Sequence, residues 1–274
     1  MNRLRHVGNS TNRNTEACNC VIFRLDDIPY DFATYDDARI DTDLAVMDVF
    51  HKKNQDLTIG LVVRYLELYP KLLEFILQGY RRGTFELALH GWDHDDYSKL
   101  SQVDQERYLL RAKTKLDKLI GNHSKIFIPP YNKFNRYTIN TMKKLGINII
   151  SSSVYSDYHL IFMANQTKKI RHDNHIYHLP EMVSFEAFQG AKPIRIPLAQ
   201  IIRDIEHCLS KYGYAIITLH PQTFVKFTET KSTELSLKES MLDIDQINQL
   251  NSLIDMLLER NIRITNFSKL VGIE

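Results

Sequence analysis

The sequence predicts an α/β fold built on a mostly parallel sheet. Short apolar or β-branched runs alternate with longer helical patterns, which is the order expected of βαβ units. About eight such runs occur, enough for a barrel or a large wound sheet. With 274 residues, 43% of them hydrophobic and 25% charged, the chain can bury the core of one large domain.

Several of the predicted strands are continuously apolar or β-branched, as expected of parallel strands covered on both faces. The predicted strands are 21–25, 57–63, 85–89, 125–128, 147–151, 176–179, 214–219 and 262–265. Because the carboxyl ends of parallel strands gather at one edge, that edge is the place to look for a site.

The segments between these strands have helical patterns. The predicted helices are 41–54, 69–82, 101–120, 134–145, 197–211 and 244–260. Ser101 and Asp104 resemble a capping box at the start of one of them. Residues 155–195 and 222–240 interrupt the alternation and are predicted to be long loops. We expect a flexible N-terminal arm over 1–19 and a single domain over 20–274.

Composition argues against several classes of partner. The 35 basic and 33 acidic residues are spread along the chain, for a formal net charge of +2, so we expect no nucleic-acid partner. No apolar stretch approaches the ~18 residues of a transmembrane helix. No apolar signal core is present, so we expect a cytoplasmic protein, or an extracytoplasmic one if a leader is missing.

Three cysteines are too few for a disulfide framework and are interpreted as free thiols.

Titratable side chains follow three of the predicted strands. The first strand ends in RLDDIP, with Asp26 and Asp27 adjacent, and the third ends in LALHGWDH, with His90 and His94 four residues apart. Two histidines at this spacing can bind one divalent ion if the segment turns, with Asp27 as third ligand. The alternative is a solvated polar loop. A lone histidine, His220, ends the penultimate strand.

These segments, in this order, resemble the motifs of the NodB-homology polysaccharide deacetylases, carbohydrate esterase family 4. RLDDIP resembles the family's Thr-Phe-Asp-Asp-Gly motif, HGWDH its His-Ser/Thr-x-x-His motif, FIPPYN its Arg-x-Pro-Tyr-Gly segment and ITLHP its Leu-x-His segment. The chain is similar to a divergent branch that carries FR-x-DD, HGW-x-H and HPQ-type segments. The matches span residues 20 to about 221.

The resemblance implies a distorted (β/α) barrel of about seven to eight mostly parallel strands. It also implies hydrolytic removal of acetyl groups from N-acetylated or O-acetylated carbohydrate by metal-activated water. One divalent ion would be the cofactor, Zn²⁺ in the first place, with Co²⁺ or Mn²⁺ as alternatives. Matched position by position, the metal ligands would be Asp27, His90 and His94.

The same matches imply the catalytic roles. Asp26 would be the general base, His220 the general acid, and the backbone N–H of Tyr131 would donate to the oxyanion. Trp92, Pro130 and Tyr131 are the predicted substrate-binding residues. For Trp92, a half-buried position at the barrel rim is the alternative to contact with a sugar ring.

Two departures from the family pattern stand out. The motif arginine that orients the base falls at Ile128, and Arg24, two residues before Asp26 on the same strand face, is a hypothetical substitute. No orienting partner for His220 can be placed in the sequence. A carbohydrate-binding pseudoenzyme and a hydrolase of non-sugar amides therefore remain as alternatives to the deacetylase.

Overall fold

The structure is a computed structural model that describes residues 18–29, 37–153, 172–173, 176–189, 192–226 and 241–273. Its strands are β1 (Cys20–Ile28), β2 (Leu57–Leu61), β3 (Phe85–Leu89), β4 (Ile126–Phe127), β5 (Ile149–Ile150), β6 (His172–Asp173), β7 (Ile176–His178), β8 (Val183–Ser184), β9 (Glu186–Gln189), β10 (Lys192–Arg195), β11 (Tyr214–Leu219), β12 (Val225–Lys226), β13 (Met241–Leu242) and β14 (Arg263–Thr265). Its α-helices are α1 (Asp37–Lys53), α2 (Pro70–Arg82), α3 (Gln102–Ile120), α4 (Arg136–Leu145), α6 (Leu198–Tyr212), α7 (Ile244–Glu259) and α8 (Phe267–Val271). Short 3-10 helices are η1 (Val63–Leu68), η2 (Pro130–Asn132) and η3 (Pro221–Phe224).

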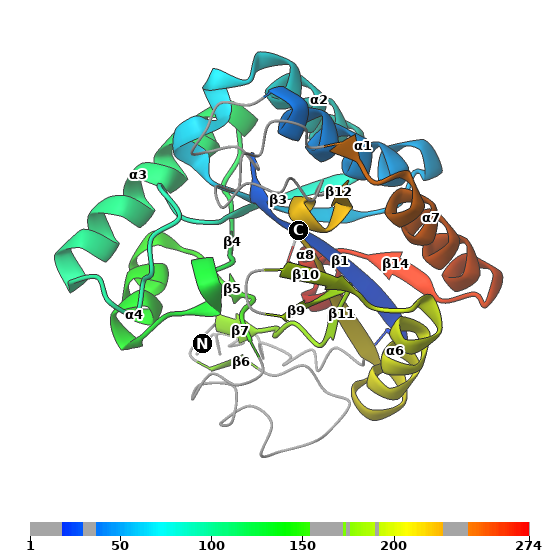
Figure 1. The fold of residues 1–274 in the computed structure, drawn as a ribbon. Coiled ribbons are helices and arrows are strands. Elements are labelled where there is room, and N and C mark those ends of the chain that lie inside the picture. The colour runs from blue at the N-terminus through cyan, green and yellow to red at the C-terminus, as the bar shows by residue number, and fades with distance from the viewer. Residues whose placement is uncertain are drawn as a thin grey trace, which may run out of the picture.

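The main sheet has ten strands in the order β6-β7-β5-β4-β3-β2-β1-β11-β8, with β14 paired to β1 beside this path. Its pairings are parallel except the one between β6 and β7. Figure 1 shows the sheet curled at the centre of the molecule, with α1, α2, α3, α4, α6 and α7 around it. The predicted α/β class, a distorted barrel of mostly parallel strands, is confirmed.

Side chains of β1 alternate between two apolar clusters. Val21, Phe23 and Leu25 belong to the larger cluster, which includes buried side chains of the surrounding helices. Cys20 and Ile22 belong to the second cluster, which unites one face of the strands with α8: Ala88, Ile126, Ile128, Ile149, Leu179, Ile216, Phe267, Leu270 and Val271. The second cluster therefore fills the inside of the curled sheet.

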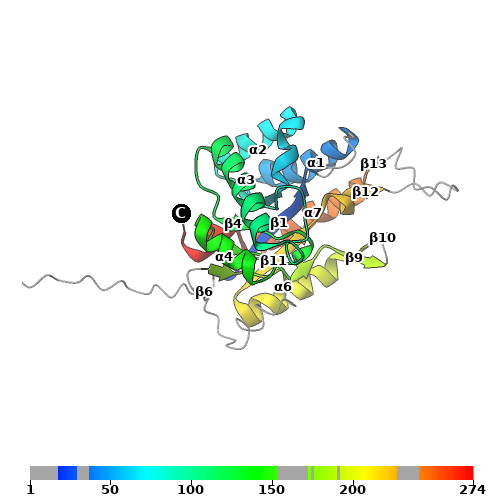
Figure 2. The same cartoon turned by 90° about the vertical axis from the view of Figure 1, so that its left-hand side faces the viewer.

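Helix α8 closes one end of the barrel. Glu86, near the start of β3, accepts hydrogen bonds from the backbone N–H groups of Phe267 and Ser268, both at 2.9 Å. Figure 2 shows α8 on one side of the molecule and the β9–β10 and β12–β13 pairs on the other. The amino ends of the strands are thus covered by α8, which leaves the carboxyl ends for the site.

Most element predictions agree with the structure. Each predicted strand overlaps an observed strand and each predicted helix an observed α-helix, although 57–63 also runs into the start of η1. Ser101 caps α3 by accepting a hydrogen bond from the Asp104 N–H. The loop prediction for 155–195 is wrong in its described part, which contains β6 to β10. Apart from β7, which overlaps the predicted strand 176–179, these strands were missed because they are two to four residues long, too short to show a period-2 pattern. The part of the predicted loop at 227–240 lies outside the described residues.

The interpretation of the cysteines as free thiols is wrong for two of them. Cys18 and Cys20 form a disulfide, and Cys208 is free and buried. The left-handed backbone of Asn19, φ 49°, lies between two cysteines whose Cα atoms are 5.2 Å apart. Sequence spacing alone does not reveal such a local turn.

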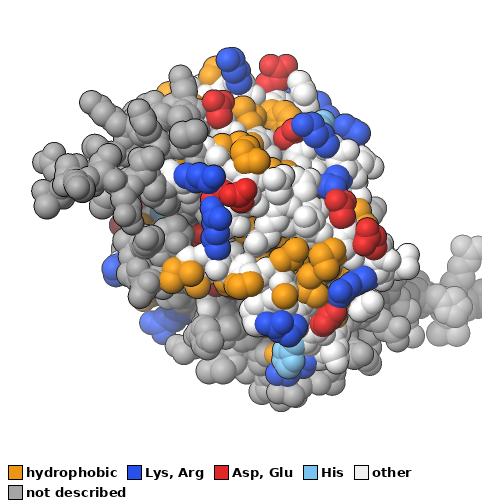
Figure 3. Space-filling model, turned by 45° about the vertical axis from the view of Figure 1, so that its right-hand side comes forward, with side chains coloured by type: hydrophobic (Ala, Val, Ile, Leu, Met, Phe, Trp, Pro, Cys, Tyr) orange, Lys and Arg blue, Asp and Glu red, His pale blue; other side chains and the backbone are white. Residues whose placement is uncertain are grey.

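Two observations concern the ends and the surface of the chain. Residues 1–17 of the predicted arm lie outside the described residues, and no helix in the described ranges is long and apolar enough to cross a membrane. On the face seen in Figure 3, basic and acidic side chains are interspersed, consistent with the near balance of charge.

Candidate active site

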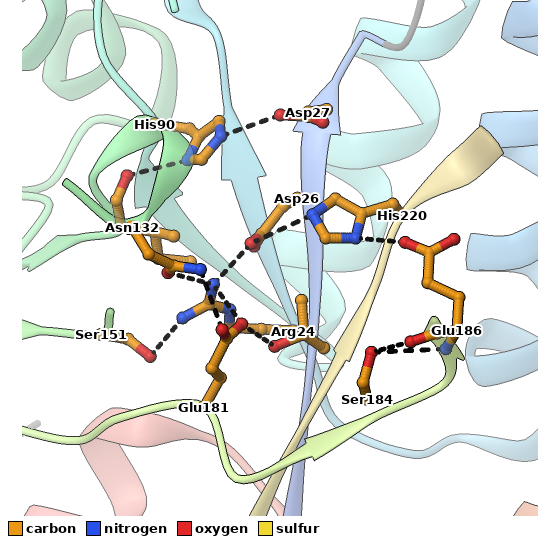
Figure 4. Close-up of polar contacts among 12 residues, drawn as sticks. Arg24, Asp26, Asp27, His90, Asn132, Ser151, Glu181, Ser184, Glu186 and His220 are labelled. Carbon is orange, nitrogen blue, oxygen red and sulfur yellow. Dashed lines mark hydrogen bonds and ion pairs between the residues drawn. The ribbon is translucent and has the colours of Figure 1, made fainter. Parts of the chain in front are cut away.

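The predicted site residues come together at the carboxyl ends of the parallel strands. Asp26 and Asp27 lie in the last part of β1, His90 directly follows β3, Tyr131 lies in η2 after β4, and His220 directly follows β11. Figure 4 shows most of these side chains converging above the strand ends. The residues that the strand order singled out therefore lie together at one edge of the sheet.

A bulge in β1 lets adjacent aspartates face the same site. Arg24 and Asp26 continue the inward-facing positions of Cys20 and Ile22. The pairing of β1 with β2 shifts register between Leu25 and Ile28, and Asp27 has a left-handed backbone with φ 64°. The strand therefore does not end at the aspartates, as the sequence suggested, but changes direction through a bulge.

Asp27, His90 and His94 form a cluster with the donor set of a metal site. One ligand atom from each lies within 4.8 Å of the others, and this is the one such group found among the described residues. The Asp27 Oδ1 is 2.9 Å from the Nε2 atom of both His90 and His94. One carboxylate and two imidazoles suit Zn²⁺ and related divalent ions and leave a coordination position for water. The residues present therefore fit the ion that the family implies.

The surrounding backbone orients these ligands. His90 Nδ1 is 2.8 Å from the Ile128 carbonyl oxygen, so the ring donates there and directs Nε2 towards Asp27. His94 has a left-handed backbone with φ 52°, as has Asp27. Burial alone would raise the pKa of Asp27, but hydrogen bonds from His90 and His94 and the nearby imidazole charges hold it well below its usual range. The ionised form of Asp27 is therefore favoured, which is the form that could bind a metal ion.

Asp26 is a buried carboxylate with one bonded and one free oxygen. The side chain of Arg24 donates from Nη2 to Oδ2 at 2.8 Å, while Oδ1 has no partner among the described residues. Asp26 is 1% exposed. Gly60 on β2 makes room for it, because a Cβ at that position would lie 3.2 Å from Oδ1. The free oxygen can thus accept a proton from a reactant.

Arg24 contacts Asp26, as expected of a substitute for the family's motif arginine. Besides Asp26, its guanidinium donates to Ser151 Oγ at 2.8 Å, Asn132 Oδ1 at 3.0 Å and Glu181 Oε2 at 3.4 Å (Figure 4). Ile128, at the motif position of the family arginine, is fully buried inside the barrel. Arg24 on β1 therefore contacts Asp26, the residue that the motif arginine would orient in the family pattern.

The partner of His220 is Glu186, which the sequence reasoning missed. His220 Nδ1 is 2.7 Å from Glu186 Oε1, and Glu186 also accepts from the Thr223 hydroxyl. Burial would lower the pKa of His220, but the bond to Glu186, followed by the charges of Asp27 and Asp26, raises it to about 9. His220 Nε2 lies 3.9 Å from Asp26 Oδ2. The charges of Glu186, Asp27 and Asp26 thus favour the protonated form of the His220 ring, which lies beside Asp26.

The turn after β4 presents Tyr131 next to the metal-type cluster. Pro130 is buried, and Tyr131 has a left-handed backbone with φ 57°. The phenol ring contacts the His94 ring at a centroid distance of 4.6 Å and is 60% exposed. Its backbone N–H makes no hydrogen bond to the described residues. The turn therefore offers a free N–H and an exposed aromatic ring beside the cluster.

Trp92 lies against α3 instead. Its side chain is 8% exposed, and the Arg111 guanidinium covers the ring at 4.0 Å. It lines a surface pocket of about 210 Å³ together with Arg64, Asp93, Asp95, Tyr108 and Arg111. None of the residues of the metal-type cluster lines this pocket. Trp92 is therefore buried against α3, more deeply than the half-buried rim position expected as the alternative to sugar contact.

The fold is a distorted α/β barrel whose clustered polar side chains lie at the carboxyl ends of the strands. Residues 27–150 match the family model for polysaccharide deacetylases. Over this part, which includes Asp27, His90 and His94, the chain is similar to polysaccharide deacetylases.

Solved structures of low sequence identity share the fold. A protein from Mycobacterium smegmatis assigned as a polysaccharide deacetylase aligns with a TM-score of 0.62 and 17% identity over 95% of this chain and 91% of its own. A family 4 acetyl xylan esterase from Clostridium thermocellum, in complex with a cobalt ion, aligns at 0.54 and 13% over 92% and 90%. A family 4 pseudoenzyme from Bacillus anthracis aligns at 0.54 and 12% over 92% of this chain, which spans 65% of that chain.

Proposed function

We propose that this protein is a metal-dependent hydrolase that removes acetyl groups from N-acetylated or O-acetylated carbohydrate. The observation that carries the proposal is the meeting of the Asp27, His90 and His94 cluster with a buried carboxylate, Asp26, and a histidine, His220. The family match and the cobalt-bound esterase among the structural neighbours support it.

Asp27, His90 and His94 would hold the ion, with Zn²⁺ proposed first and Co²⁺ or Mn²⁺ as alternatives. When bound, a divalent ion supplies Lewis-acid activation of water and of the acetyl carbonyl. The exposed Tyr131 ring and the buried Pro130 would form the substrate-contacting wall beside it.

The protein's own groups complete the reaction. Asp26 takes a proton through its free Oδ1 as the water oxygen bonds to the acetyl carbon. The Tyr131 N–H donates to the carbonyl oxygen as that oxygen becomes negative. The bond from the acetyl carbon to the sugar nitrogen or oxygen then breaks, and His220 gives its proton to the leaving atom. The products are acetate and the deacetylated sugar.

Metal content and acetate release test this proposal together. Purified protein should contain about one divalent ion per chain, His94→Ala should lose it, and Asp26→Asn should keep the ion and abolish acetate release. A panel of acetylated glycans and small amides distinguishes carbohydrate from non-sugar substrates. Carefully prepared protein without a bound ion would contradict the proposal.

A pseudoenzyme is the second candidate, because Ile128 stands where the family has its arginine and one structural neighbour is a pseudoenzyme. It predicts glycan binding without acetate release, unchanged by Asp26→Asn. The contact from Arg24 to Asp26 at 2.8 Å favours the active enzyme, since the base keeps a guanidinium partner. Arg24→Met therefore distinguishes the two: it should reduce turnover of an enzyme and leave the affinity of a binder unchanged.

A further inference from the structure

Asn132 bonds to two charged side chains at once. Its Oδ1 accepts from Arg24 Nη2 at 3.0 Å, and its Nδ2 donates to Glu181 Oε1 at 3.0 Å. Asn132 directly follows Tyr131 in η2. The side chain therefore connects the turn that presents the Tyr131 N–H to the arginine that contacts Asp26.

Glu181 is held by contacts with β11 and with the segment that follows β5. Its Oε2 accepts from the Thr218 hydroxyl on β11 at 3.1 Å and from Arg24 at 3.4 Å. Its backbone N–H donates to the Ser152 carbonyl, just after β5, at 2.7 Å. Glu181 therefore gives Asn132 an acceptor whose position is set by strands on both sides.

The turn requires such an attachment because its backbone is left-handed at consecutive residues. Tyr131 and Asn132 both have φ 57°, a conformation that is unfavourable for most residues and persists only where the surroundings fix it. Asparagine tolerates this conformation better than most residues. The backbone bonds of the turn are local, from the Asn132 N–H to the Pro129 carbonyl at 3.0 Å and from the Lys133 N–H to the Pro130 carbonyl at 3.1 Å. The Asn132 side-chain bonds add the attachment to the barrel.

We propose that Asn132 and Glu181 form a positioning pair that holds the Tyr131 turn against Arg24 and so fixes the Tyr131 N–H relative to the Asp26 carboxylate. The inference rests on the proposed function, in which these groups act on one acetyl carbon. Neither member of the pair touches the reacting atoms. Their role is to set the relative position of the groups that do.

Single and reciprocal substitutions test the pair. Glu181→Gln places an amide where an acceptor is needed, and Asn132→Asp removes the donor and puts a carboxylate beside Glu181. Each should lower kcat by about tenfold or more through misplacement of the turn, with KM and metal content close to the parent values. The double variant exchanges donor and acceptor at the same total charge, so it should recover much of the lost kcat.

Asn132→Gly removes the side chain while keeping a left-handed turn accessible, so it provides a second test should a charged variant fold poorly. Its matched control is Asn261→Gly, at an exposed residue with φ 56° after α7. Asn132→Gly should lower kcat and Asn261→Gly should not. Single variants that unfold at lower temperature but retain kcat would overturn the inference, as would a double variant no better than the single ones.

A readout without turnover separates this inference from the proposed function. If the parent protein releases no acetate from any glycan, the proposed function fails by itself. Amide hydrogen exchange of residues 131–133 then tests the pair: exchange should be faster in Glu181→Gln and return towards the parent rate in the reciprocal double variant. Equal exchange in all three proteins would overturn the inference.

Discussion

Replacing Glu186 with glutamine should lower the pKa of His220. The parent value of about 9, against an ordinary 6.5, corresponds to roughly 3 kcal/mol in favour of the protonated ring. Glu186 is the strongest contributor that raises it, through the 2.7 Å bond to Nδ1, and Asp27 and Asp26 contribute the rest. Loss of one adjacent negative charge moves a pKa by about 1 to 2 units, so His220 in the variant should titrate near pH 7 to 8.

Stability should change with pH in a defined direction. Because the folded-state pKa of His220 is raised, its contribution to stability is complete below about pH 6.5 and is lost as pH rises through about 9. The difference in free energy of unfolding between parent and Glu186→Gln should therefore be largest near pH 6 and disappear above about pH 9. If His220 is the general acid, as proposed, the variant should lose about two- to tenfold in kcat near pH 8, where a smaller fraction of its His220 is protonated.

Nuclear magnetic resonance titration of the His220 ring in metal-free protein measures the pKa directly, and urea unfolding at several pH values measures the stability. Glu259→Gln, at an exposed residue of α7, is the matched control and should change neither. The reasoning is refuted if His220 titrates at the same pH in Glu186→Gln, or if the stability difference is the same at pH 6 and pH 9.

Three further predictions follow from single contacts. Gly60→Ala adds a Cβ at 3.2 Å from Asp26 Oδ1, so kcat should fall roughly tenfold with metal content retained, and an unchanged kcat would contradict the role of that oxygen. Burial raises the pKa of Glu86 above 4.5, so stability should decline as pH rises from about 4.5 through the folded-state value, and urea unfolding of Glu86→Gln should lack this decline. Trp92→Phe weakens the contact with Arg111 at 4.0 Å and should lower stability by about 1 kcal/mol without raising KM, whereas a higher KM would mark a sugar-binding role.

The sequence predicted the fold class and the edge of the sheet that carries the site. Apolar runs and helical patterns are local properties of the chain, and parallel strands bring their carboxyl ends together whatever their exact lengths. The spacing of His90 and His94 and the adjacency of Asp26 and Asp27 are local too. The candidate metal ligands could therefore be identified before their positions were known, and Arg24 could be suggested because it lies two residues from Asp26.

Only the tertiary structure could identify the partners that orient these groups. Glu186 is 34 residues before His220, and Glu181 is 157 residues after Arg24. Both lie among strands too short to give a periodic signal. No sequence pattern predicts the bulge at Asp27 or the left-handed turn at Tyr131 and Asn132. The sequence by itself determined which side chains are candidates for catalysis and metal binding. Long-range packing decided which carboxylates, amides and arginines orient them, because such contacts depend on where distant segments meet in the folded chain.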